Sequence, residues 1–212
     1  MPAEGRRRAG GIAPDKSRTA LLIIDMISDF RFEDAPQLLP RLRPVVRRIA
    51  ALKSRAGAMG IPTIYVNDNF GRWQSDFAGL VKYCTAPGQP GAGLVGNLVP
   101  GKDDYFVLKP RHSGFYASSL ETLLENIGAR RLILTGISSH QCVLFTANDA
   151  YVREYELKIP RDCTAAPSLP QLRLALAYFQ MVLGADIRPA AAFGNWRRGG
   201  PKKHTIRRRS RD

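Results

Sequence analysis

Cysteine is scarce in this chain of 212 residues, which contains only Cys84, Cys142 and Cys163. An odd number leaves at least one thiol unpaired, so a disulfide framework is not expected and a reducing, cytoplasmic location is favoured. The sequence also lacks an apolar run long enough to cross a membrane, and it lacks the apolar segment of a secretory signal. We therefore expect no membrane partner.

Acidic residues are also few, since 18 Asp and Glu stand against 32 Lys and Arg and give a formal net charge of +14. Most of this charge lies at the ends, with a net +3 in residues 1–18 and +7 in residues 197–212. Such tails either contact nucleic acid or remain flexible and solvated. The second interpretation is favoured, because nothing between the tails indicates base stacking, so nucleic acid is not expected as a partner. We predict flexible basic tails at 1–18 and 191–212 around one domain, 19–190.

Strand and helix signals alternate through this central domain. Short aliphatic runs predict buried strands, whereas longer segments with apolar residues three and four positions apart predict helices. Strands are expected at 19–25, 61–66, 105–109, 131–136, 155–160 and 184–188, and helices near 38–58, 116–128, 140–153 and 170–183. The alternation predicts an α/β fold of three layers: a doubly wound, mainly parallel six-stranded sheet with helices on both faces, as in Rossmann-like folds.

Residues 67–104 form the one long insertion, which by its length is typical of a lid or a binding loop. Residues 73–84 could form a helix, and 87–101 are rich in glycine and proline and indicate an irregular loop. Trp73 and Phe77 are candidates either for contact with a substrate or for packing of this lid onto the domain. We retain Trp73 as a predicted substrate contact.

Three residues with reactive or charged side chains stand where predicted strands end. Asp25 follows four aliphatic residues, Lys109 ends another short strand, and Cys142 lies in the first turn of a predicted helix. Singly, they could be a capping acid, a solvated lysine and a buried core cysteine. Together they indicate a site, because the carboxyl ends of parallel strands meet at one edge of a sheet.

The chemistry of this trio is coherent. The positive end of a helix dipole favours a thiolate, so we expect a lowered pKa for Cys142, the predicted nucleophile. Asp25 would take the thiol proton and later deliver it to the leaving group. Lys109 would keep Asp25 ionised, and backbone N–H groups of the turn 138–142 would hold the oxyanion.

With these residues in view, the chain resembles the isochorismatase-like cysteine hydrolases, which include nicotinamidases, N-carbamoylsarcosine amidases, ureidoacrylate and biuret amidohydrolases, and isochorismatases. The resemblance covers about residues 19–188. It rests on three motifs in order: Asp25 with Phe30 five positions later, Lys109 followed by Ser-Gly-Phe at 113–115, and Gly-Ile-Ser-Ser-His-Gln-Cys-Val at 136–143.

The resemblance implies roles for individual residues. It makes Asp25, Lys109 and Cys142 the catalytic residues and Phe30 an aromatic lining of the pocket. It places a cis peptide bond between Ile137 and Ser138, whose Ser138 N–H joins that of Cys142 in an oxyanion hole. The predicted substrate contacts are Phe30, Trp73, Ile137, Ser138 and Gln141. It also implies a homo-oligomer, either a dimer or a tetramer, acting on a small molecule.

One departure from the family concerns metal binding. Nicotinamidase-type members carry an Asp and several His after the second strand, whereas here Asp68 is followed by no His before His112. A divalent site would lack its imidazoles, so we expect neither a metal nor another cofactor, and Asp68 is interpreted as a turn residue. His112 either approaches the pocket or lies on the surface, and the second interpretation is favoured.

Three functions remain from different classes. The first is a cysteine hydrolase of C–N bonds in small amide, carbamoyl or ureido compounds, working through a thioester on Cys142. The second is a vinyl-ether hydrolase of the isochorismatase type, which the resemblance implies would lack the cysteine. The third is a non-catalytic scaffold whose basic tails bind a partner. The intact trio favours the first function.

Overall fold

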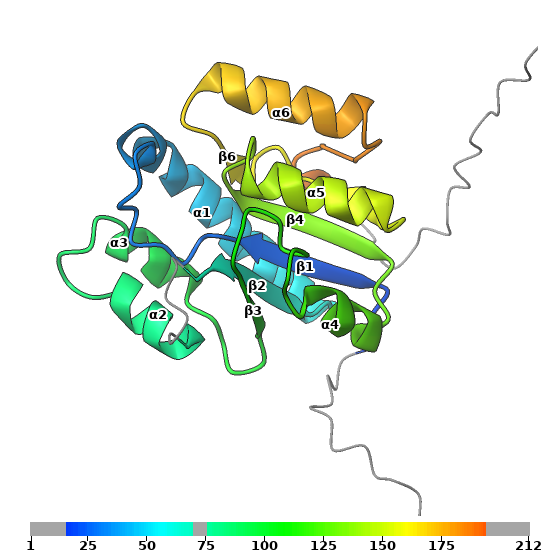
Figure 1. Cartoon of the computed structure of the whole chain (residues 1–212), viewed down its shortest axis with the longest axis horizontal. Helices are drawn as coiled ribbons and strands as arrows, with labels where there is room; N and C mark the ends of the chain where they lie inside the picture. Colours follow the sequence, from blue (N-terminus) through cyan, green and yellow to red (C-terminus); the bar gives the residue numbers. More distant parts are fainter. Residues whose placement is uncertain (1–15, 70–75, 194–212) are drawn as a thin grey trace, which may run out of the picture.

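The computed structural model describes residues 16–69 and 76–193 and shows a sheet between layers of helices (Figure 1). Trp73 and most of both predicted tails lie outside the described residues. The strands are β1 (Thr19–Ile24), β2 (Thr63–Asp68), β3 (Tyr105–Lys109), β4 (Arg131–Ile137), β5 (Glu156–Lys158) and β6 (Thr164–Ala165). The helices are α1 (Ala35–Ala58), α2 (Phe77–Cys84), α3 (Ala92–Val95), α4 (Leu120–Ile127), α5 (Cys142–Val152) and α6 (Leu169–Met181), with 3-10 turns η1 (Gly96–Leu98) and η2 (Ala190–Ala192).

The strand order is β3-β2-β1-β4-β5, and β6 pairs with β4 beyond the end of β5. All the named strand pairs are parallel. After β3 the chain returns to the other side of β1, so β1 and β4 are neighbours at the point where the winding direction reverses. In open α/β sheets ligands bind at such a point, outside the carboxyl ends of the strands.

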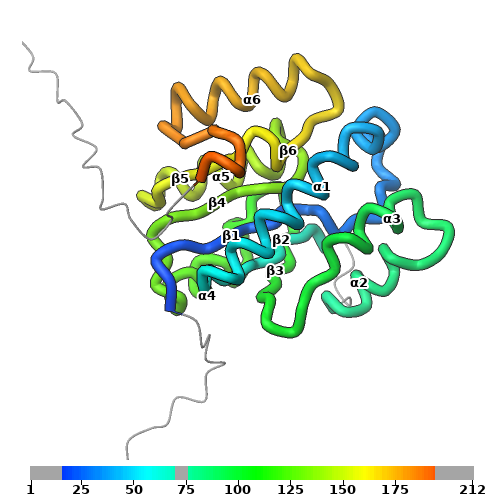
Figure 2. The backbone as a smooth tube through the Cα atoms, turned by 180° about the vertical axis from the view of Figure 1, so that it is seen from behind, coloured from blue at the N-terminus to red at the C-terminus, as the bar shows by residue number. Residues whose placement is uncertain are grey.

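Alternation along the buried strands builds two hydrophobic cores. Leu21 and Ile23 of β1 pack on the face that α1 covers, together with residues of α2 and α3. Leu22 and Ile24 point to the opposite face, where α4, α5 and α6 supply the apolar side chains. Figure 2 shows α1 across the face of the sheet that lies behind in Figure 1. The predicted α/β architecture with helices on both faces is confirmed.

The sixth strand differs from the sequence prediction. Residues 184–188 make only an isolated bridge, between Asp186 and Lys158, and the sixth strand is Thr164–Ala165 instead. The side chain of Asp186 accepts a hydrogen bond from the backbone N–H of Arg188 (3.1 Å), which turns the chain after one bridge. Nearby, Pro160 lacks an N–H donor, so β5 ends before it and the chain rejoins β4 four residues later.

The described part of the insertion is more ordered than a loop. A helix over 73–84 was expected, and α2 begins at Phe77, after Asp76, whose side chain accepts a hydrogen bond from the N–H of Gly79. The ring of Phe77 stacks on that of Phe106 at 4.7 Å between centroids and contacts Tyr65 at 6.1 Å. Phe77 therefore packs the lid onto the sheet.

Candidate active site

Two neighbouring strands deliver Asp25 and Cys142 to the same edge of the sheet. Asp25 directly follows β1, and Cys142 begins α5 after the short turn that follows β4. Gly136 of β4 lies opposite Ile24 and has a φ of +106°, and a Cβ there would lie 2.0 Å from the Ile24 carbonyl oxygen. Only glycine allows the two strands to approach this closely beside the site.

Lys109 reaches the same point from farther away. β3 is separated from β1 by β2, and neighbouring strands lie about 4.8 Å apart, so roughly 10 Å must be spanned. A lysine side chain is long enough to cover most of this distance, and it passes Asp68, its register partner on β2. The Lys109 side chain is fully buried.

The three predicted residues meet. Lys109 Nζ lies 2.9 Å from Asp25 Oδ2 and 3.6 Å from Cys142 Sγ. The other carboxylate oxygen of Asp25 accepts a hydrogen bond from the Asp68 N–H at 2.8 Å. Asp25 has a φ of +51°, and its own N–H donates to the Val66 carbonyl at 2.9 Å. Hydrogen bonds to the backbone of β2 thus hold Asp25 in place, with its own backbone in an uncommon left-handed conformation that Asp tolerates.

The pKa of the Cys142 thiol is raised, not lowered as predicted. Burial is the largest cause, and the negative charge of Asp25 adds to it, whereas Lys109 acts in the opposite direction. The prediction considered the helix dipole but not the desolvation of a thiol placed beside a carboxylate. A thiol whose pKa is raised needs a base to take its proton before it can attack.

Lys109 remains charged at the centre of the site. Burial by itself would lower its pKa, but Asp25, Cys142 once its sulfur is ionised, and Asp68 outweigh burial and raise the pKa above its ordinary value. A fully buried ammonium without such partners would lose its proton instead. The site therefore groups the Lys109 ammonium with the carboxylates of Asp25 and Asp68, and the Cys142 thiol lies against the ammonium.

The turn between β4 and α5 is held by backbone hydrogen bonds. The peptide bond between Ile137 and Ser138 is cis. The Ser138 carbonyl accepts hydrogen bonds from the N–H groups of Gln141 (3.0 Å) and Val143 (3.2 Å). Cys142 is the first residue of α5, where an N–H has no acceptor within its own helix.

The other predicted substrate contacts lie close to this turn or next to β1. Gln141 is half-buried and precedes α5, while Ile137 is buried in the core on the α1 side. Phe30 is buried against Gly91, where an added Cβ would lie 2.0 Å from its ring. Trp73 lies outside the described residues. The roles of these residues in binding a substrate stay predictions.

Two residues were underestimated from the sequence. Asp68, interpreted as a turn acid, has a carboxylate 3.6 Å from Lys109 Nζ. His112, favoured as a surface residue, is exposed as expected, and its Nδ1 atom also lies 3.7 Å from Cys142 Sγ. The signal for Asp68 was its place at the end of a buried strand, close to the position that Asp25 has after β1. For His112 the signal was its spacing of three from Lys109.

The described residues offer no cluster suited to a metal ion. Within residues 16–69 and 76–193, no three His, Cys, Asp or Glu side chains are grouped so that they could hold a metal ion. Asp68, the residue that matches the family's metal ligand, contacts the ammonium of Lys109. Its described surroundings thus fit a counter-ion of Lys109 better than a ligand of a divalent cation.

Among the described helices, none is long and apolar enough to span a bilayer.

The fold and this site define the class. Residues 19–189 match the isochorismatase domain, so the chain belongs to the isochorismatase family. The resemblance seen in the three motifs is confirmed.

Particular relatives sharpen this placement. The uncharacterized isochorismatase family protein YaaI of Bacillus subtilis is 41% identical over 172 residues, which cover 81% of this chain and 94% of that protein. Ureidoacrylate amidohydrolase RutB of Methylorubrum extorquens is 29% identical over 190 residues, covering 76% and 75% of the two chains. The crystal structure of N-carbamoylsarcosine amidase from Thermoplasma acidophilum superposes with a TM-score of 0.63 at 25% identity, over 82% of this chain and 97% of that one.

Proposed function

We propose that the protein is a cysteine hydrolase that cleaves a C–N bond in a small amide, carbamoyl or ureido compound. Cys142 is the nucleophile, Asp25 is the general base and then the general acid, and Lys109 supplies electrostatic support. The observation that carries this proposal is the single cluster in which Lys109 Nζ contacts both Cys142 Sγ and Asp25 Oδ2. It brings a thiol, a cation and a base within reach of one reacting carbonyl carbon.

The first half-reaction forms a thioester. The Cys142 sulfur attacks the carbonyl carbon while its proton passes to Asp25, which the raised pKa of the thiol makes necessary. The carbonyl oxygen becomes an oxyanion, for which the N–H groups of Ser138 and Cys142 are the proposed donors. Asp25 then gives the proton to the nitrogen, and the C–N bond breaks.

The second half-reaction restores the thiol. Water attacks the thioester carbon while Asp25 takes one of its protons, and the tetrahedral intermediate expels the sulfur. The proton returns from Asp25 to sulfur, and the acid product leaves. Throughout, Lys109 keeps its proton and offsets the negative charge that alternates between carboxylate and sulfur.

The substrate class is drawn from the relatives together with the residues. The named activities of RutB and of the Thermoplasma enzyme are both hydrolyses at ureido or carbamoyl nitrogen. A vinyl-ether substrate is disfavoured, since such a reaction needs protonation rather than a nucleophilic sulfur at position 142. A homo-oligomer also remains a proposal, for which light scattering of the purified chain is the measurement.

The test is ammonia release from a panel of primary amides, carbamoyl compounds and ureido compounds. The wild type is compared with Cys142→Ala and with Cys163→Ala, which removes a thiol outside the site. We expect release by the wild type and by Cys163→Ala, and a loss of at least 1000-fold, as an order of magnitude, in Cys142→Ala. Undiminished release by Cys142→Ala would contradict covalent catalysis. Silence of the wild type on every compound would contradict the substrate class.

A further inference from the structure

The proposed mechanism leaves one contact to the nucleophile unused. Cys142 Sγ lies 3.6 Å from Lys109 Nζ and 3.7 Å from Nδ1 of His112, so two nitrogen atoms approach the same sulfur at nearly equal distance. His112 lies on the segment that follows β3, and its residue is exposed to solvent. It therefore approaches the sulfur from the open side, whereas Lys109 approaches from the buried interior.

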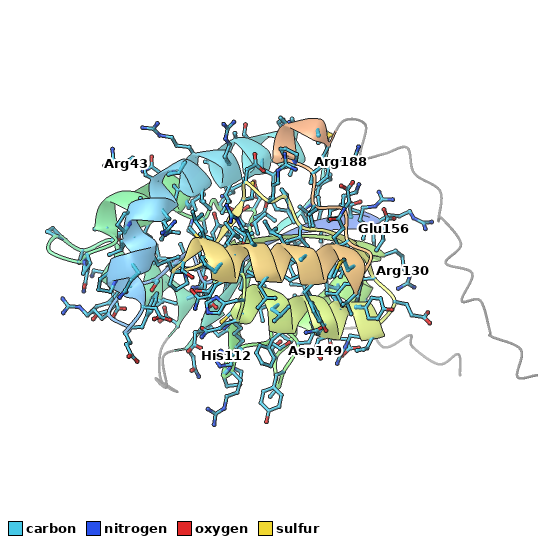
Figure 3. All side chains as sticks on the ribbon, turned by 90° about the horizontal axis from the view of Figure 1, so that it is seen from above. Arg43, His112, Arg130, Asp149, Glu156 and Arg188 are labelled. Carbon is cyan, nitrogen blue, oxygen red and sulfur yellow. The ribbon has the colours of Figure 1, made fainter. Side chains whose placement is uncertain are left out.

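The ring of His112 is held in place by α5, the helix that begins at Cys142. It lies against the ring of Phe145 at 5.3 Å between centroids. Figure 3 shows His112 and Asp149 beside the same helix. Phe145 is three positions after Cys142, so the nucleophile and the residue that supports the histidine lie on adjacent turns of one rigid element.

The segment after His112 is tied to α5 as well. Ser113 donates a hydrogen bond from its hydroxyl to the carboxylate of Asp149, and the Gly114 N–H donates to Thr146 Oγ1 at 2.9 Å. Asp149 also lies 3.6 Å from Arg153. These bonds connect the backbone beside His112 to the helix that carries the sulfur. The backbone of this segment and the Cys142 sulfur are therefore held in position relative to each other.

We propose that His112 is a further catalytic residue, which donates a hydrogen bond from Nδ1 to the sulfur of Cys142 whenever that sulfur is ionised. The proposal rests on the proposed function, since it requires Cys142 to be the nucleophile. No proton changes owner in this step: the thiol proton goes to Asp25, and His112 keeps its own. The thiolate is thereby held between two N–H donors, one on the buried side and one on the open side.

A second N–H donor to the sulfur adds to Lys109, which also contacts two carboxylates. Lys109 divides its N–H groups between the sulfur and two carboxylates, Asp25 at 2.9 Å and Asp68 at 3.6 Å. Within the described residues, His112 contacts the sulfur and an aromatic ring. A hydrogen bond to a charged acceptor is stronger than one to a neutral acceptor, so His112 stabilises the thiolate more than the thiol.

Other charged groups near His112 and Cys142 come from each neighbouring element. Asp25 follows β1, Asp68 ends β2, Lys109 ends β3, Arg111 is on the same segment as His112, and Asp149 with Arg153 lies on α5. A test by pH must therefore compare variants in which all of these stay in place. Substitution of His112 alone satisfies this condition.

Two matched variants separate the donor from the ring. His112→Phe keeps an aromatic ring against Phe145 but removes the nitrogen, whereas His112→Asn removes the ring but can place an amide N–H near the position of Nδ1. The measurement is the rate of alkylation of Cys142 by iodoacetamide from pH 6 to pH 11, read by mass spectrometry of the peptide that contains it. The buried thiols of Cys84 and Cys163 are internal references.

We expect the midpoint of the alkylation profile to move up by about one pH unit in His112→Phe and to change little in His112→Asn. The value of kcat/KM on the best substrate of the panel should fall roughly 10-fold or more in His112→Phe and recover in His112→Asn. Equal midpoints in all three proteins would overturn the proposal, and so would equal shifts in both variants. Alkylation needs no substrate, so a wild type that releases no ammonia would count against the proposed function alone.

Discussion

The turns that carry Cys142 and Cys163 both place a thiol beside an aspartate near the end of a parallel strand. The pKa of each thiol is raised first by burial and next by the carboxylate, Asp25 for Cys142 and Asp162 for Cys163. They differ in what else surrounds the sulfur. Cys142 is half-buried with two nitrogen atoms within 3.7 Å, whereas Cys163 is fully buried and contacts Asp162 at 3.8 Å.

Burial and a neighbouring carboxylate are common to both thiols, so they do not single out Cys142 as the proposed nucleophile. Cys142 differs in its partial exposure and in the two nitrogen atoms beside its sulfur. Arg48 and Arg55 oppose the rise in the pKa of Cys163, as Lys109 does for Cys142. The Cys163 side chain is fully buried, however. The comparison can be tested by changing the partners of the two cysteines in parallel.

The largest effect is expected from Asp25→Asn. The general base is lost, so kcat/KM should fall by about 100- to 10,000-fold. At the same time the negative charge that raises the pKa of Cys142 disappears, so the midpoint for alkylation of Cys142 should move to lower pH. The variant would then be more reactive toward iodoacetamide at pH 7 and less active toward a substrate.

The matched control is Asp162→Asn, which changes the carboxylate beside Cys163. It should leave turnover within a few-fold of the wild type and leave the alkylation of Cys142 unchanged. If Asp25→Asn instead shifted the midpoint upward, the carboxylate would be supporting the thiolate rather than opposing it. The assignment of Asp25 as base would then be wrong.

A smaller effect, on stability rather than on turnover alone, is expected from Lys109→Met. The substitution keeps the volume of a fully buried side chain but removes the ammonium that contacts the carboxylates of Asp25 and Asp68. Because both carboxylates are partly exposed, we expect the free energy of unfolding to fall by about 2 kcal/mol, below the cost of breaking a fully buried pair. Urea unfolding at pH 7 measures it.

The double variant Asp25→Asn with Lys109→Met sharpens this result. The double variant removes the Asp25 charge together with the ammonium that it contacts, so it should be more stable than Lys109→Met, although inactive. Additive losses of stability would mean that the ion pair is not the reason for burying Lys109.

The sequence was sufficient for the parts of the site that depend on strand ends. Asp25 follows a strand, Lys109 ends one and Cys142 begins the helix after one, and a parallel sheet must bring such positions to one edge. The same reasoning, applied to Asp68, would have placed it beside Lys109. It was interpreted as a turn residue because two asparagines flank it, and a pattern of polar residues says nothing about the cation opposite.

Other features could not be predicted because they depend on tertiary distances. The spacing of three from Lys109 indicated that His112 could approach the pocket, but its distance from Cys142 depends on contacts of the segment after β3 with α5. The direction of the pKa shift of Cys142 depends on the balance between desolvation, Asp25 and Lys109, and the sequence indicated only the helix terminus. The sixth strand was misplaced because the turn at Asp186 is formed by a side chain.

The smallest effect concerns the reference thiol and the pH dependence of stability. The pKa of Cys163 is raised in the folded protein, so above the ordinary thiol pKa of about 8.5 the unfolded chain loses this proton while the folded one keeps it. Stability contributed by the protonated thiol is complete below that pH and is lost as the pH rises. From pH 7 to pH 9.5 the loss from one such thiol is about 1.4 kcal/mol.

Cys163→Ser isolates this contribution, because serine keeps a donor for Asp162 and does not ionise. Urea unfolding of both proteins at pH 7, 8.5 and 9.5 should show the wild type losing more stability with pH than Cys163→Ser. Turnover should be unaffected, in contrast to any change at Cys142. Parallel curves for the two proteins would mean that Cys163 ionises equally in the folded and unfolded chains. The raised pKa of Cys163 would then be wrong, and the comparison of the two thiols would rest on their exposure and their contacts.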